Sequence, residues 1–145
     1  MQDAVDPGGV ALAVPQEPGL FTANATGSGA PAGFWIHVPA SGAQTYGYLF
    51  NTNTLAPAPV NLAPATDQVF LSLYGTGFRA YSGQVTATVG GVSVPFYGAA
   101  AVPGYLGEDL VNIGPLPQSL VGRGAVDVVV IFDGKSANTV TVSFK

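Results

Sequence analysis

The fold is constrained most by a series of short runs rich in valine, phenylalanine, tyrosine and threonine, separated by glycine, proline, asparagine and aspartate. Helical periodicity is nearly absent, and this spacing is typical of an all-β sandwich or barrel. Two Pro/Ala-rich stretches, 55–65 and 99–107, are expected to be ordered connections, and one helical turn is expected near 118–121. We expect strands at 10–14, 34–38, 45–50, 69–74, 84–89, 92–97, 110–113, 125–132 and 138–144.

Two hairpins can be assigned a register from the sequence. A two-residue primed turn at Gly90-Gly91 places apolar residues on one face and polar residues on the other. Pro95 predicts an edge or a bulge in this hairpin, because proline cannot donate to a ladder. The expected pairs are Val89 with Val92, Ala87 with Val94, and Val85 with Phe96.

The last hairpin needs one extra residue. A two-residue turn at Asp133-Gly134 would pair Val140 with the charged Asp127. One additional residue pairs Val140 with Val128 instead and keeps the valines of both strands on one face. We therefore expect a three-residue loop or a bulge at Gly134. Residues 128–132 are apolar on both faces, which predicts a central strand.

Charge is scarce in this chain. Four Lys/Arg and eight Asp/Glu make 8% of the residues, whereas a soluble domain usually carries roughly 25%. A net charge of -4 excludes a nucleic-acid binder that works through phosphate contacts. No segment approaches the ~20 apolar residues of a membrane helix, so no membrane insertion is expected. The surface must therefore be largely neutral.

Few residues are suited to chemistry. Without cysteine there is no thiolate nucleophile and no cysteine metal site. His37 is the only histidine, and although Ser41 is near it, no nucleophile elbow is present. Glu108-Asp109 and the pair Asp3 and Asp6 lack calcium-loop spacing and are best interpreted as solvated turn residues. We expect no catalytic residue, no metal site and no cofactor.

Aromatic residues in two neighbouring runs suggest a binding platform. Trp35 and His37 share one face of 34–38, and Tyr46 and Tyr48 share a face of 45–50. If a hairpin loop joins the runs, Trp35 joins the two tyrosines in a flat surface that suits sugar rings or partner proteins. Two interpretations stay open. In the favoured one, one aromatic row is core and the other a protein interface; in the second, the platform binds glycans.

Several motifs, taken in order, resemble a known family. Residues 70–78 (FLSLYGTGF) are similar to the strand and Gly-x-Gly entry of Ig-like domains of the plexin and transcription-factor type. From residue 18 onward the chain resembles the Ig-like C-terminal domain of large secreted proteins of Solibacter-type acidobacteria. Leu110 departs from that pattern, because such domains tend to carry glutamine there. The matching pieces are PGLFTAN at 18–24, GTGF at 75–78, VGGV at 89–92, YLG at 105–107, VNI at 111–113 and DGKSANTVTV at 133–142.

The resemblance implies a non-catalytic, extracellular, immunoglobulin-like β-sandwich at 20–145 with no agreed ligand. It also implies that the segment before it corresponds to the last strand of a preceding module. In that segment Val10, Leu12 and Val14 alternate as the apolar residues of the C-terminal strand do. We therefore expect an extension at 1–19 that carries an extra strand at 10–14 and a Pro/Gly hinge.

Three fates of the strand at 10–14 are open. It can pair within its own sandwich, which is favoured; it can be donated to a neighbouring copy; or it can be a disordered tail. Donation is a head-to-tail contact that does not close and so builds filaments. The expected function is a structural module that self-associates through strand complementation and edge contacts. The alternative is a carbohydrate-binding or adhesion module.

Location and modification are the last expectations. The first 20 residues lack a basic n-region and a continuous apolar stretch, so no signal peptide is recognised. Either export processing has already occurred or the chain is part of a longer polypeptide. We expect a secreted or cell-surface protein. Asn24-Ala25-Thr26 is an N-glycosylation sequon, which makes Asn24 a candidate site.

Overall fold

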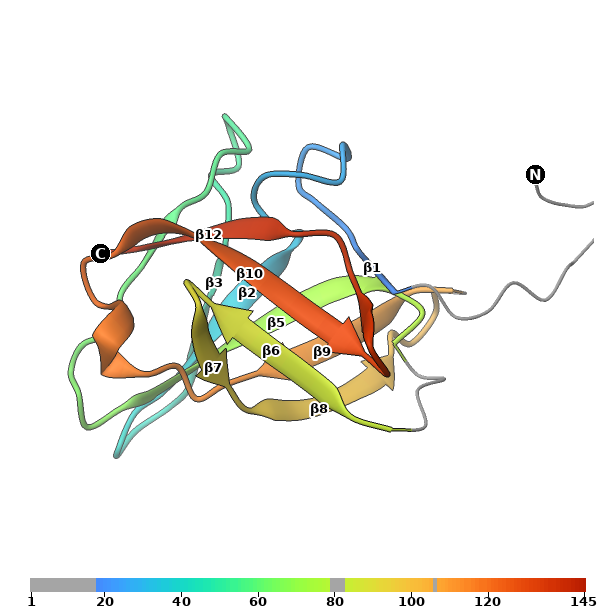
Figure 1. Ribbon diagram of the computed structural model, residues 1–145. Helices are drawn as coiled ribbons and strands as arrows, with labels where there is room; N and C mark the ends of the chain where they lie inside the picture. Colours follow the sequence, from blue (N-terminus) through green and yellow to red (C-terminus); the bar gives the residue numbers. More distant parts are fainter. Residues whose placement is uncertain (1–17, 79–82, 106) are drawn as a thin grey trace, which may run out of the picture.

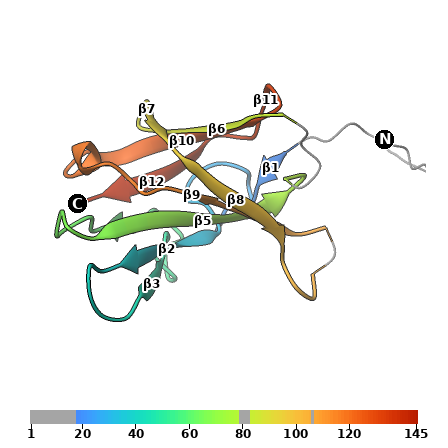
Figure 2. The ribbon, with the colours of Figure 1, turned by 90° about the horizontal axis from the view of Figure 1, so that it is seen from below.

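The computed structural model describes residues 18–78, 83–105 and 107–145. They form two β-sheets packed face to face, so the predicted all-β sandwich is confirmed (Figure 1). Figure 2 shows the layers from another side, with β2, β3 and β5 in one and β6, β10 and β12 in the other. A 3₁₀ turn at Gln118–Leu120 lies where the helical turn was predicted. Among the described residues, no helix is both long enough and apolar enough to span a membrane.

The first sheet has the order β3-β2-β5-β9-β8, and β1 pairs with the end of β5. In β5, Val69, Leu71 and Leu73 are buried, while Phe70 and Tyr74 lie on the other face. One face of this sheet is therefore core and the other faces solvent. Its strands are β1 (Gly19–Leu20), β2 (Gly33–Val38), β3 (Thr45–Tyr48), β5 (Gln68–Thr76), β8 (Phe96–Ala101) and β9 (Asp109–Ile113).

The second sheet has the order β4-β12-β10-β6-β7, with β11 pairing beside β10. The predicted central strand is confirmed, because β10 lies between β12 and β6. The outward positions of the second sheet are mainly polar, including Thr86, Thr88, Ser93, Asp127, Thr141 and Ser143. Its strands are β4 (Pro59–Val60), β6 (Val85–Val89), β7 (Val92–Val94), β10 (Gly124–Phe132), β11 (Lys135–Ser136) and β12 (Val140–Phe144).

The hairpin at Gly90-Gly91 has the predicted register up to Val94. The predicted pairing of Val85 with Phe96 is wrong, because the chain leaves the second sheet at Pro95 and continues in the first. There Phe96 pairs with Ile113 and begins β8. Proline has no N–H with which to extend the β6–β7 ladder, so the strand changes sheets at this residue. Part of the expected connection at 99–107 is consequently strand.

The last hairpin confirms the predicted pairing of Val140 with Val128, but not the expected place of the extra residue. Asp133 and Gly134 form a two-residue turn, with φ values of 51° and 82°. Lys135 and Ser136 continue the ladder directly as β11. The additional residue therefore lies between β11 and β12, where the strand is interrupted.

Asn138 occupies that interruption and joins the two sheets. Its Oδ1 accepts from the Leu20 N–H at 2.7 Å, and its Nδ2 donates to the Leu20 carbonyl at 2.9 Å. The same Nδ2 donates to the Gly27 carbonyl at 2.8 Å. The side-chain amide thus bonds Leu20 as a strand backbone would. The irregular register turns Asn138 toward β1 and ties the first strand to the opposite sheet.

A buried carboxylate orders the GTGF turn. Phe78 is fully buried and stacks on Phe132, with ring centroids 4.9 Å apart and an interplanar angle of 3°. The Phe78 N–H donates to Asp109 Oδ2 at 3.0 Å, and Asp109 is only 4% exposed. The interpretation of Asp109 as a solvated turn residue is therefore wrong. The acid begins β9 and fixes the turn that follows β5.

We predict that Asn138→Asp lowers the free energy of unfolding by about 1–3 kcal/mol, because it keeps the acceptor and removes the amide donor for the carbonyl of the buried Leu20 and for that of Gly27. Urea unfolding measures this change. Asn53→Asp, in an exposed loop, is the matched control and should change stability little. Equal stability of the two variants would show that Asn138 does not join the sheets energetically.

Candidate functional site

The solvent face of the first sheet is aromatic. Its outward strand positions carry no charged residue, in contrast to the Thr/Ser-rich face of the second sheet. We call this surface the aromatic face. By strand register and ring contacts, its members include Phe34, Ile36, Val38, Tyr46, Tyr48, Phe70, Ser72, Tyr74, Tyr97, Leu110 and Asn112.

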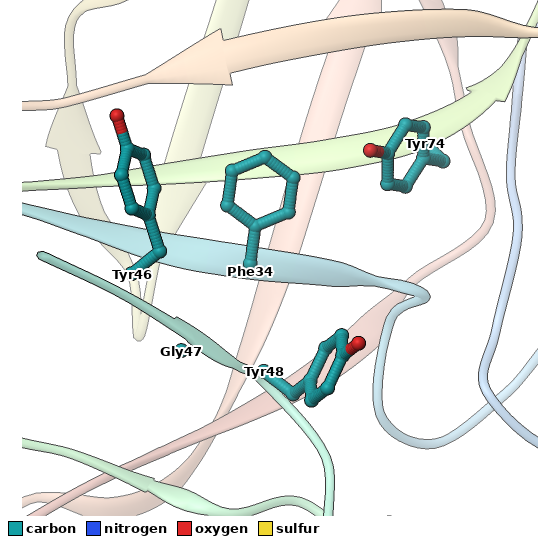
Figure 3. A pocket seen from close by; sticks show the side chains of 5 residues that line it. All are labelled: Phe34, Tyr46, Gly47, Tyr48 and Tyr74. Carbon is teal, nitrogen blue, oxygen red and sulfur yellow. The ribbon is translucent and has the colours of Figure 1, made fainter.

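The pairing of β2 with β3 creates the centre of this face. Phe34 lies opposite Tyr48 and Ile36 opposite Tyr46, so the large side chains of both strands point the same way. The Phe34 ring lies 6.1 Å from that of Tyr46 and 6.0 Å from that of Tyr74. Together with Gly47 these aromatic residues line a hollow of about 570 Å³ (Figure 3). Cross-strand aromatic pairs of this kind also stabilise the sheet.

A second, smaller hollow extends the face toward β8. Its volume is about 160 Å³, and its lining includes Ile36, Phe70 and Tyr97. The Phe70 and Tyr97 rings are 5.0 Å apart. Between the strands, Ser72 Oγ donates to Asn112 Oδ1 at 2.6 Å, so these polar groups satisfy each other within the sheet. The aromatic face therefore crosses the whole sheet from β3 to β8.

Three of the four tyrosines of the aromatic face are well exposed, and Tyr74 is half-buried. The exposed fractions are 60% for Tyr46, 61% for Tyr48 and 70% for Tyr97. The solvent face of an antiparallel sheet is usually polar, as the second sheet shows. A contiguous exposed apolar patch marks an interaction site more often than a free surface. This face is accordingly the strongest candidate for a functional site among the described residues.

Trp35 does not belong to this face, although the sequence placed it beside the tyrosines. It pairs with Gly47, and its side chain packs against the core on the opposite side of the sheet. The indole covers Gly47 so closely that any Cβ at that position would overlap it. Phe34 takes the predicted place of Trp35 next to Tyr46 and Tyr48. The expected neighbour of Tyr46 and Tyr48 in β2 was therefore wrong by one residue, and a role of these tyrosines in binding stays a prediction.

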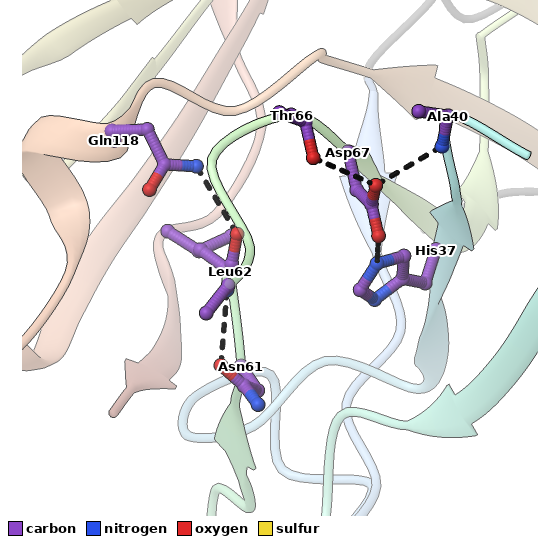
Figure 4. Close-up of polar contacts among 8 residues, drawn as sticks. His37, Ala40, Asn61, Leu62, Thr66, Asp67 and Gln118 are labelled. Atoms are coloured by element: carbon purple, nitrogen blue, oxygen red, sulfur yellow. Dashed lines mark hydrogen bonds and ion pairs between the residues drawn. The ribbon is translucent and has the colours of Figure 1, made fainter.

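His37 lies on the same inner side as Trp35 and is held by a carboxylate (Figure 4). Its Nε2 is 2.7 Å from Asp67 Oδ2, and Asp67 Oδ1 accepts from the Ala40 N–H at 3.0 Å. The hydrogen bond from His37, followed by that from Ala40, lowers the pKa of Asp67. The pair ties the end of β2 to the loop before β5. It shares no side of the sheet with Tyr46 or Tyr48.

Asn24 is exposed and organises a turn. Its Oδ1 accepts from Thr22 Oγ1 at 3.0 Å and from the Thr26 N–H at 3.1 Å. Glycosylation of Asn24 stays a prediction. The predicted interface residues Val10, Leu12 and Val14 lie outside the described residues. In the part of the chain that the structure describes, no three His, Asp or Glu side chains lie close enough together to hold a metal ion.

The chain was compared with protein-family models, with curated proteins and with solved structures, and none of the three comparisons gave a match. The resemblance to Ig-like acidobacterial domains therefore stays a prediction.

We predict that Asp67→Asn destabilises the fold near neutral pH and that the difference from the unsubstituted chain shrinks in acid. A pKa lowered by folding contributes stability above the ordinary value of 3.8, and this contribution disappears as the pH falls through the folded pKa. Urea unfolding at a series of pH values measures it. Asp127→Asn, on the exposed face of β10, controls for the loss of one negative charge. A deficit that persists unchanged in acid would contradict the assigned role.

Proposed function

We propose that this protein is a non-enzymatic, extracellular structural module that self-associates in a fibre or surface assembly. The observation that carries the proposal is the charge-free aromatic face of the first sheet. Burial of exposed tyrosines in a contact contributes apolar area at low cost in side-chain entropy. The Ig-like resemblance supports an extracellular setting for such a module. Association through this face requires no charge to be desolvated.

The scarcity of charge supports the same proposal. Soluble domains usually carry enough surface charge to oppose association. Here 8% of residues are charged, and none occupies an outward position on the strands of the aromatic face. The second sheet retains a polar surface with Asp127 exposed, so the two faces of the sandwich differ in kind. We infer one associating face and one solvated face.

Strand edges contribute the second mode of association. Edge strands present unpaired backbone groups and are usually protected by charge, proline or bulges. The apolar alternation of Val10, Leu12 and Val14 suits strand addition to such an edge in a neighbouring copy. Because such a contact is head-to-tail, it extends without closing. The face and the donated strand together would build a filament.

A carbohydrate-binding or adhesion module is the second candidate. The hollow lined by Phe34, Tyr46, Tyr48 and Tyr74 favours it, because aromatic faces stack on sugar rings. The side-chain polar groups of the residues that line this hollow are the hydroxyls of Tyr46, Tyr48 and Tyr74, and that of Tyr46 already donates to Gln44 Oε1 at 3.1 Å. Protein association therefore remains the better supported function.

Tyr48→Lys tests both candidates, because it places a charge in the hollow at an exposed position. We expect at least about tenfold weaker self-association by sedimentation velocity, as for loss of an interface anchor. Tyr105→Lys is the matched control, since Tyr105 is 64% exposed in the connection between β8 and β9.

Equal association of the two variants would contradict the role of the aromatic face. Binding of the unsubstituted chain, but not of Tyr48→Lys, to an immobilised glycan array would support the second candidate instead. Circular dichroism confirms that both variants are folded.

A further inference from the structure

One sheet edge lacks the usual protection against strand addition. The strands at the ends of the two sheet orders are β3 and β8 in the first sheet and β4 and β7 in the second, while the two-residue strands β1 and β11 pair beside β5 and β10. Pro59 begins the two-residue β4, and Pro95 follows the three-residue β7. A bulge between Phe96 and Gly98 interrupts β8. These are devices that limit edge pairing, and β3 has none of them: it contains no proline, charge or bulge.

The backbone of β3 presents hydrogen-bonding groups at this edge. The Leu49 N–H donates to the Gly33 carbonyl at 3.1 Å just beyond the strand. In an antiparallel pair, residues bond the partner strand alternately, so Gly47 also directs its N–H and C=O toward β2. Tyr46 and Tyr48 then direct theirs away from β2, out of the sheet. Two N–H and two C=O groups are thus in register for one more strand.

We propose that the segment 10–14 of a neighbouring copy adds to the β3 edge, a step that rests on the proposed function and identifies its partner. The five-residue segment fits a strand of four residues. Neither it nor β3 carries a charge, so no charged group is buried by the pairing. One row of its side chains would lie beside Tyr46 and Tyr48 and extend the aromatic face. The other row would lie beside Gly47, next to the indole of Trp35.

The position of β1 favours a neighbour's edge over the chain's own. Gly19 pairs with Thr76 at the far end of β5, whereas Tyr48 lies level with Ser72, on the other side of β2 (Figure 2). A strand added outside β3 would lie about four residues along the sheet from Gly19 and two strand spacings to the side. The straight path between them is therefore about 16 Å. Residues 15–19 reach at most about 17 Å when fully extended. No length is left for the reversal of direction that pairing within one chain requires.

Disulfide trapping tests the proposal, because the chain has no cysteine of its own. Leu12→Cys and Ala13→Cys chains, which sample both rows of the donor segment, are each mixed with Tyr46→Cys chains and oxidised. In the control mixtures, Ala100→Cys, on the outward side of the β8 edge, replaces Tyr46→Cys. On non-reducing gels we expect one of the Tyr46→Cys mixtures to give at least about tenfold more mixed dimer than its control. The two cysteines are on different chains, so any mixed dimer reports contact between copies.

A backbone variant separates edge pairing from side-chain contact. Tyr46→Pro removes one outward N–H without breaking a β2–β3 hydrogen bond, and proline is tolerated at such positions of an edge strand. It should weaken assembly at least about tenfold, whereas Tyr46→Val, which keeps the N–H, should weaken it less.

Three outcomes would overturn the β3 assignment: a dominant Ala100→Cys product, a dominant disulfide between two Tyr46→Cys chains, or full assembly of Tyr46→Pro. In each case the chain still associates, and the proposed function stands. An unsubstituted chain that does not associate at all would instead refute the proposed function itself.

Discussion

The pairing of Trp35 with Gly47 is the contact on which the site depends. It fixes the register of β2 against β3, because the indole occupies the space where any other residue would place a Cβ. A shift by one residue would exchange the faces of β3 and turn its tyrosines toward the core. With the observed register, the indole completes the core while Phe34, Tyr46 and Tyr48 gather on the outside. A single glycine thus determines which aromatic residues meet solvent.

The two sheets of the sandwich solve the same packing problem with different outer surfaces. Both supply alternating apolar residues to a shared core, in which Phe78 stacks on Phe132. The outer side of the second sheet carries mainly threonine and serine, at positions that alternate along the strands with buried aliphatic residues, as in a sheet with one face exposed to water. On the first sheet, aromatic residues occupy those positions instead. Since both sheets pack on one shared core, we attribute the difference to what contacts the outer surfaces rather than to folding.

Much of the fold follows from local pattern. The register of the Gly90-Gly91 hairpin as far as Val94, the pairing of Val140 with Val128, the central position of β10 and the turn at Gln118–Leu120 were predicted from alternation and turn chemistry. The strand change at Pro95 was missed, because proline marks an interruption without telling which sheet the chain enters next. Asp109 was misinterpreted, since its partner Phe78 lies 31 residues away in sequence. Contacts at that range leave no periodic signal.

The candidate site shows the same limit. Tyr46 and Tyr48 were identified because they alternate within one run, but the length of the loop before them does not determine which row of β2 they join. The structure joins them to Phe34 rather than to Trp35. A usable signal was present in 69–74, where both rows are largely apolar although the strand belongs to a sheet with one solvated face. Such a strand predicts an apolar outer surface.

Sedimentation equilibrium of the unsubstituted chain over a wide concentration range, at low and at high salt, tests the central claim most directly. If the aromatic face and the β3 edge associate, the weight-average mass exceeds that of one chain and rises with concentration. Because neither surface contains a charged residue, added salt should not dissociate the assembly. A mass equal to that of one chain at every concentration, or dissociation by salt, would contradict the account.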